Sequence, residues 1–83
     1  MIKISFSIEE KKCIALDNNI EVGECSFAEI DNTWNINHTY VKEEYQGQGI
    51  ARKLVECVKE QADYYHKNLI ADCSYADKVL SRR

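Results

Sequence analysis

The sequence predicts an α+β domain, because the spacing of its apolar residues changes once along the chain. From residue 2 to residue 41, apolar and polar side chains alternate in short runs separated by turn residues, which is typical of antiparallel strands. From about residue 48, apolar residues recur every three or four positions, and a short apolar run follows at 69–71. The predicted order is therefore an antiparallel β-meander followed by one β–α–β unit.

Four predicted strands make up the meander, at residues 2–8, 12–16, 20–28 and 33–41. Turns are predicted at 17–19 and 31–32, where Asp and Asn tolerate left-handed backbone geometry. In the second part, an amphipathic helix is predicted from about Gln48 to His66. A fifth strand, from Leu69 to Ala71, would then lie parallel to the fourth through a right-handed crossover. Residues 74–83 are expected to form a last short helix.

Simple alternation assigns the side chains of the fourth strand to two faces. One face is predicted to carry Trp34, Ile36, His38 and Tyr40. The other is predicted to carry Asn35, Asn37, Thr39 and Val41. On the first face, His38 is either a hydrogen-bonded histidine among apolar neighbours or a general base, since imidazole titrates near neutral pH.

A loop with two glycines, Gln46-Gly47-Gln48-Gly49-Ile50-Ala51, joins the fourth strand to the helix. Backbone N–H groups at a helix start are unpaired, and the positive end of the helix dipole lies there, so the loop suits a phosphate or pyrophosphate. Arg52 and Lys53 in the first turn also fit better beside a bound anion. The alternative is a plain turn with solvated charges. The loop matches the dinucleotide fingerprint only in part, because Arg52 stands at the third glycine position.

Length, net charge and cysteine spacing limit the classes of function that fit the sequence. With 83 residues the chain is expected to form a single domain, and its net charge of −3 argues against nucleic acid as the main partner. No apolar run reaches membrane-spanning length. Four cysteines occur without a C-x-x-C pair, so we expect no metal, reduced thiols and a cytoplasmic location.

The loop, as Gln46-x-x-Gly49-x-Ala51, resembles the Q/R-x-x-G-x-G/A loop with which the GNAT superfamily of N-acetyltransferases holds the pyrophosphate of acetyl-CoA. Residues 38–41, 44–55 and 73–75 together resemble a short GNAT-like, acetyl-CoA-binding subfamily. The resemblance implies one minimal acetyltransferase domain over 1–83, with a V-shaped split between strands four and five. The early helices and late strands that usually build the acceptor site in a full-length GNAT enzyme are missing.

This resemblance implies acetyl-CoA as co-substrate and an amine as acceptor, which the sequence does not identify. The expected cofactor-binding residues are Tyr40, Val41, Gln46, Gly47, Gln48, Gly49, Ile50, Ala51 and Arg52. His38 and Cys73 are the expected catalytic residues, because parallel strands end at the same sheet edge and a Cys–His pair can form a thiolate nucleophile. Direct attack with His38 as base, an inert Cys73, and a non-catalytic acetyl-CoA-binding module are the alternatives.

Overall fold

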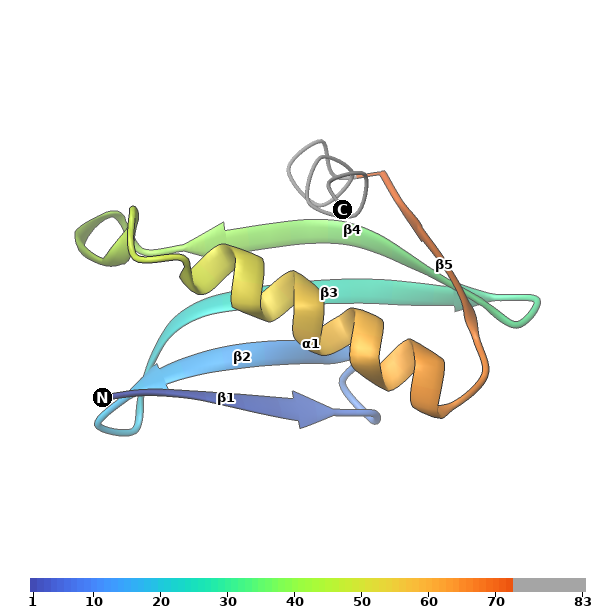
Figure 1. Cartoon of the computed structure of the whole chain (residues 1–83), viewed down its shortest axis with the longest axis horizontal. Coiled ribbons are helices and arrows are strands. Elements are labelled where there is room, and N and C mark those ends of the chain that lie inside the picture. Colours follow the sequence, from blue (N-terminus) through green and yellow to red (C-terminus); the bar gives the residue numbers. More distant parts are fainter. Residues whose placement is uncertain (73–83) are drawn as a thin grey trace.

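The computed structural model of the chain describes residues 1–72 and contains a five-stranded sheet with one long helix on one face (Figure 1). The elements are β1 (Ile2–Ser7), β2 (Lys12–Asp17), β3 (Ile20–Ile30), β4 (Thr33–Val41), the 3₁₀ helix η1 (Glu43–Tyr45), α1 (Ile50–Tyr64) and β5 (Asn68–Ala71). The strands lie in sequence order; β1 to β4 pair antiparallel, and β5 pairs parallel to β4. The predicted meander and β–α–β unit are confirmed.

Residues with a left-handed backbone conformation lie in the turn between β2 and β3 and next to both ends of α1. Asn18 and Asn19 turn the chain between β2 and β3 with φ of 51° and 69°, as predicted for these residue types. α1 begins two residues later than predicted, because Gly49 precedes it in a left-handed conformation with φ of 81°. It also ends two residues earlier, and His66 beyond it has φ of 59°.

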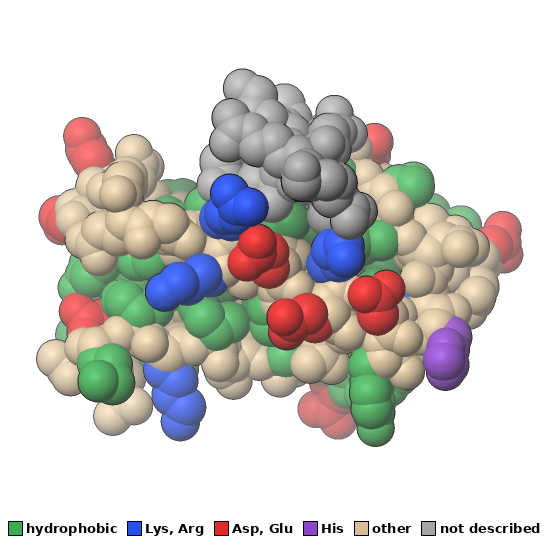
Figure 2. Space-filling model, viewed as in Figure 1, with side chains coloured by type: hydrophobic (Ala, Val, Ile, Leu, Met, Phe, Trp, Pro, Cys, Tyr) green, Lys and Arg blue, Asp and Glu red, His purple; other side chains and the backbone are tan. Residues whose placement is uncertain are grey.

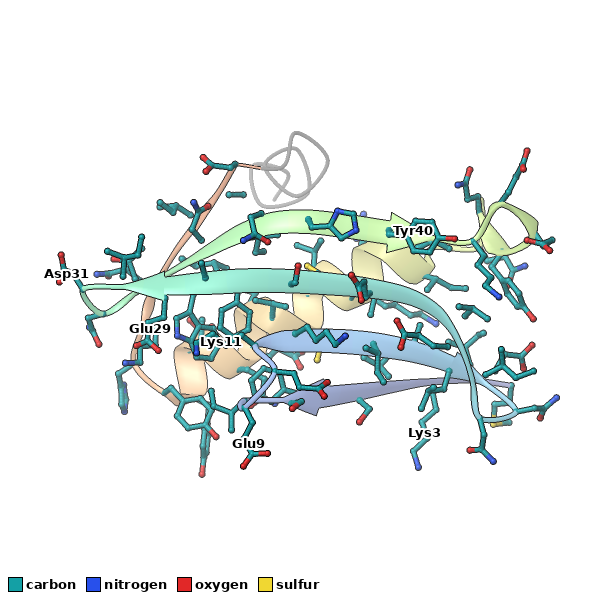
Figure 3. All side chains as sticks on the ribbon, turned by 180° about the vertical axis from the view of Figure 1, so that it is seen from behind. Lys3, Glu9, Lys11, Glu29, Asp31 and Tyr40 are labelled. Atoms are coloured by element: carbon teal, nitrogen blue, oxygen red, sulfur yellow. The ribbon has the colours of Figure 1, made fainter. Side chains whose placement is uncertain are left out.

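The core lies between α1 and the sheet face beneath it. The helix contributes its apolar stripe of Ile50, Leu54, Val55, Val58 and Ala62. The sheet contributes Cys13, Ala15, Val22, Cys25, Phe27, Trp34, Ile36 and Val41. The outward face of α1 is solvated: Figure 2 shows acidic and basic side chains mixed over it, among them ion pairs at 52–56 and 59–63. The described residues place no helix on the opposite face of the sheet (Figure 3).

A β-bulge interrupts the pairing of β3 with β4. Ser26 pairs with His38, but the next residue, Phe27, pairs with Ile36, so Asn37 has no partner of its own. The Ser26 hydroxyl donates a hydrogen bond to Asn37 Oδ1 at 3.1 Å. One extra residue in a strand shifts the alternation of every side chain after it.

The face assignment predicted for the end of β4 is therefore wrong. Trp34 and Ile36 share a face as predicted, and this face is turned to α1, but beyond the bulge Thr39 and Val41 turn towards the helix side. His38 and Tyr40 lie on the helix-free face and are exposed; Figure 3 shows Tyr40 in front of the sheet with α1 behind it. The prediction assumed unbroken alternation, which holds only for a strand without a bulge.

β4 and β5 separate along their length and form the predicted V-shaped split (Figure 1). Their pairing runs from Thr33–Asn68 to Ile36–Ala71, and the Asp72 N–H donates to the Ile36 carbonyl at 2.9 Å. Past Ile36, β4 has no β5 residue beside it. Cys73 and residues 74–83, for which a short helix was predicted, lie outside the described residues. Within residues 1–72, no helix has the length and apolar character needed to cross a membrane.

Candidate functional site

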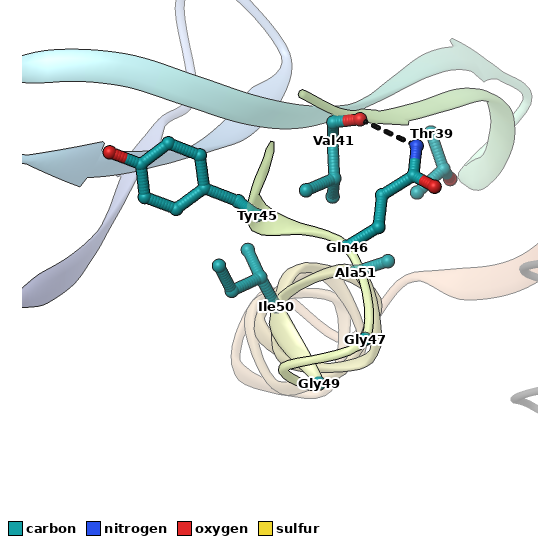
Figure 4. Close-up of a pocket in the computed structure, with 8 residues that line it drawn as sticks. All are labelled: Thr39, Val41, Tyr45, Gln46, Gly47, Gly49, Ile50 and Ala51. Atoms are coloured by element: carbon teal, nitrogen blue, oxygen red, sulfur yellow. Dashed lines mark hydrogen bonds between the residues drawn. The ribbon is translucent and has the colours of Figure 1, made fainter. Parts of the chain in front are cut away.

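A pocket of about 560 Å³ lies where β4 has lost its β5 neighbour and α1 begins (Figure 4). It is lined by Thr39, Val41, Tyr45, Gln46, Gly47, Gly49, Ile50 and Ala51. Six of these residues were predicted from the sequence to contact the cofactor, and the pocket brings them together. The site thus combines two different kinds of backbone: a strand edge and a helix start.

The glycine loop supplies the polar end of this pocket. Gly47 and Gly49 both have positive φ, 84° and 81°, and nothing lies within 4 Å of where a Cβ would stand on either. The first hydrogen bond of α1 runs from the Lys53 N–H to the Gly49 carbonyl at 3.1 Å. Among residues 1–72, the N–H groups of Ile50, Ala51 and Arg52 therefore have no backbone acceptor. With no acidic residue in the first turn, this end of the helix favours an anion.

The other wall of the pocket is the edge of β4 beyond Ile36, which is free of any other strand within residues 1–72. The Lys42 N–H donates to the Val22 carbonyl at 2.8 Å, so even-numbered residues beyond the bulge bond to β3. In an antiparallel ladder the alternate residues point the other way, which directs the N–H groups of Thr39 and Val41 to the edge that β5 has left. A ligand with amide groups can pair with this edge as a strand would.

Two side chains hold the loop against the sheet. Gln46 Nε2 donates to the Val41 carbonyl at 3.1 Å (Figure 4). The Tyr45 hydroxyl donates to Asp17 Oδ2 at 2.6 Å. This hydrogen bond, helped by the N-terminal amine, holds the pKa of Asp17 below its ordinary value, and the carboxylate raises the pKa of Tyr45. The hydrogen bonds from Gln46 to Val41 and from Tyr45 to Asp17 thus fix the shape of the pocket.

Tyr45 and Thr39 line the pocket although they were not among the predicted site residues. Thr39 was predicted to share a face with Val41, and its position two residues before Val41 on the same strand was the available signal. For Tyr45, the available signal for a pocket wall was its position two residues before the first loop glycine.

Three residues predicted to bind the cofactor do not line the pocket. Gln48 lies exposed in the loop. Arg52 lies in the first turn of α1, half-exposed, with its Nε 3.1 Å from Glu56 Oε2. Tyr40 is adjacent in sequence to two pocket residues, but its side chain lies on the helix-free face (Figure 3). These positions differ from the expected arrangement and leave the roles of the three residues as predictions.

The predicted catalytic residue His38 also lies on the helix-free face. Its Nε2 is 3.7 Å from Glu24 Oε2, and its ring stacks with that of Tyr40 at 6.5 Å between centroids. Cys73 lies outside the described residues, so the pairing of His38 with Cys73 stays a prediction. Within residues 1–72, no group of three or more His, Cys, Asp or Glu side chains is placed to hold a metal ion.

Comparison with known proteins adds to this geometry. The model of a family described as GCN5-related N-acetyltransferase matches residues 10–83. Among solved structures, a GCN5-like protein from Staphylococcus aureus is 34% identical, with a TM-score of 0.74; the match covers 96% of this chain and 78% of that one. No match was found among curated proteins.

Two further structures share the fold at lower identity. A GCN5-related N-acetyltransferase from Sphaerobacter thermophilus is 21% identical with a TM-score of 0.72, over 77% of this chain and 21% of its own. A Bacillus anthracis protein solved with acetyl coenzyme A is 19% identical with a TM-score of 0.67, over 82% of this chain and 44% of its own. The chain thus spans about a fifth of the Sphaerobacter protein and under half of the Bacillus protein.

Proposed function

The chain belongs to the GCN5-related N-acetyltransferase family, and on that premise we propose that it transfers the acetyl group of acetyl-CoA to an amine. One observation carries the proposal: the glycine loop and the free edge of β4 border the same pocket. The Bacillus anthracis structure holds acetyl coenzyme A in a chain of the same fold, which supports the choice of co-substrate.

Each wall of the pocket suits one part of acetyl-CoA. The unpaired N–H groups at the start of α1 would hold the pyrophosphate, with Arg52 adding positive charge nearby. The amides of the pantetheine arm would pair with Thr39 and Val41 along the edge of β4. The thioester would then lie near the bulge, where β4 and β5 separate.

The reaction is nucleophilic acyl transfer. The acceptor nitrogen bonds to the acetyl carbon, the oxyanion that forms accepts hydrogen bonds from β4 N–H groups, and the C–S bond breaks to release CoA. His38 would take the proton from the attacking ammonium or amine. A covalent route, in which Cys73 is acetylated first, is the variant of this scheme that His38→Ala and Cys73→Ala proteins would distinguish.

Calorimetry of acetyl-CoA binding to two variants of Gly49 tests the placement of the pyrophosphate. Gly49→Asp and Gly49→Asn both introduce a side chain at positive φ, so they share the backbone cost and differ by one charge. A carboxylate near a pyrophosphate costs at least about 1 kcal/mol even in water, so Gly49→Asp should bind at least about fivefold more weakly than Gly49→Asn. Equal affinities of the two folded variants would refute the placement.

Binding of acetyl-CoA without turnover is the second candidate function. The observation that favours it is the position of His38, whose side chain lies on the sheet face opposite the side chains that line the pocket. Mass spectrometry of a panel of amines incubated with acetyl-CoA and the protein separates the two candidates. Acetylated product supports the transferase, whereas calorimetric binding without any product supports the binding module.

The cytoplasmic location and the lack of a nucleic-acid partner remain predictions from composition. Cell fractionation followed by immunodetection tests the location directly.

A further inference from the structure

A row of polar side chains crosses three neighbouring strands on the helix-free face. Glu24 on β3 stands between Lys12 on β2 and His38 on β4. Its Oε1 is 3.4 Å from Lys12 Nζ, and its Oε2 is 3.7 Å from His38 Nε2. The two oxygens of one carboxylate thus face two different nitrogen groups.

The register of the sheet explains why these groups meet. Glu24 pairs with Tyr40 and Ser26 pairs with His38, so Glu24 and His38 are diagonal neighbours on one face. They share that face only because the bulge at Asn37 turns His38 away from α1. The ring of Tyr40 stacks with the imidazole at 6.5 Å between centroids.

The two partners differ in exposure. The side chain of Glu24 is 25% exposed, whereas that of His38 is 55% exposed. The Glu24 carboxylate is paired with Lys12 and mostly covered, whereas the more exposed imidazole can contact a second molecule. This arrangement is that of a histidine with a built-in acidic partner.

We propose that Glu24 is a positioning residue for His38, with the carboxylate facing Nε2 at 3.7 Å so that Nδ1 is the nitrogen that takes the proton of the acceptor amine. The proposal rests on the proposed function of His38 as base. In this role Glu24 orients the ring, fixes its tautomer and stabilises the imidazolium after the proton has moved to Nδ1.

The charge of Lys12 opposes the stabilisation of a His38 imidazolium by Glu24. Its ammonium shares the Glu24 carboxylate, which together with Glu21 and Glu10 raises the pKa of Lys12 and keeps it charged. Glu24 attracts an imidazolium, and Lys12 repels it. Within residues 1–72, Glu24 pairs with His38, Tyr40 stacks with it, and Lys12 pairs with Glu24. Removing Lys12 and removing Glu24 should therefore have opposite effects.

Acetyl transfer by the full chain tests the pair, with Glu24→Gln, Lys12→Met and, as a matched control on the same strand, Glu21→Gln. Because the pair is partly exposed, Glu24→Gln should lower kcat about two- to fivefold without changing KM for acetyl-CoA. Glu21→Gln should leave kcat unchanged, and Lys12→Met should not lower it. Equal kcat values for Glu24→Gln and Glu21→Gln would overturn the proposal, as would equal losses of kcat in Glu24→Gln and Lys12→Met.

A second measurement separates this proposal from the proposed function. The imidazole ¹⁵N signals of His38 report which ring nitrogen carries the proton, and they require no turnover. We expect the Nε2–H tautomer in the wild type and a loss of that preference in Glu24→Gln but not in Glu21→Gln. An unchanged signature in Glu24→Gln refutes the positioning role. An altered signature in a protein that acetylates no amine supports the pair and refutes the transferase instead.

Discussion

The two halves of β4 differ in their neighbouring strands and in the surroundings of their side chains. Residues 33–36 lie between β3 and β5, and the side chains of Trp34 and Ile36 in this half are fully buried. Among the strands that the structure describes, residues 38–41 pair with β3 alone, and Thr39 and Val41 in this half border the pocket. The bulge at Asn37 separates the halves. A single extra residue, together with the departure of a neighbouring strand, turns a core strand into the wall of a pocket.

Two aromatic residues of β4 allow the largest contrast between the halves. Trp34 is fully buried and stacks on Phe27 at 4.1 Å, so Trp34→Ala should lower the free energy of unfolding by about 3–5 kcal/mol. Tyr40 is 49% exposed, so Tyr40→Ala should cost about 1 kcal/mol or less. Urea denaturation measures both. Similar losses in the two variants would contradict the division of the strand.

Hydrogen exchange of β4 amides, followed by NMR, tests the free edge directly. At acetyl-CoA concentrations about 100 times Kd, binding adds about 2.7 kcal/mol, so the amides of Thr39 and Val41 should exchange up to about a hundredfold more slowly. The Lys42 amide is the control, since it is already bonded to the Val22 carbonyl. If Lys42 gains as much protection as Thr39 and Val41, the ligand stabilises the whole fold and does not pair with the edge.

Acid denaturation of the Tyr45→Phe variant tests whether the hydrogen bond from Tyr45 to Asp17 stabilises the region of the pocket, where β4 lacks β5 as a neighbour. The Tyr45 hydrogen bond lowers the pKa of Asp17, so its contribution to stability is present above about pH 4 and is lost as the pH falls through the lowered pKa of the folded state. Tyr45→Phe should therefore be slightly less stable than the wild type at pH 7 and equally stable at pH 2. A constant difference between the two proteins at both pH values would show that the hydrogen bond to Asp17 is not its cause.

Local patterns determined most of the architecture. Period-two alternation located the four meander strands, and period 3.6 located α1 to within two residues at each end. Asn18, Asn19 and the two loop glycines adopt the positive φ that their residue types favour. These features depend on the chemistry of consecutive residues, so the sequence alone was enough to predict them, and with them the loop end of the pocket.

Only the tertiary structure decided which side chains share a face with that loop. The bulge at Asn37 belongs to the register in which β3 and β4 pair, and this register buries Phe27 and Ile36 together. The residues next to Asn37 in the sequence carry no signal that predicts the bulge. The bulge places Thr39 in the pocket and turns His38 towards Glu24. Side-chain direction in a strand has a period of two, so one unpaired residue reverses every position after it.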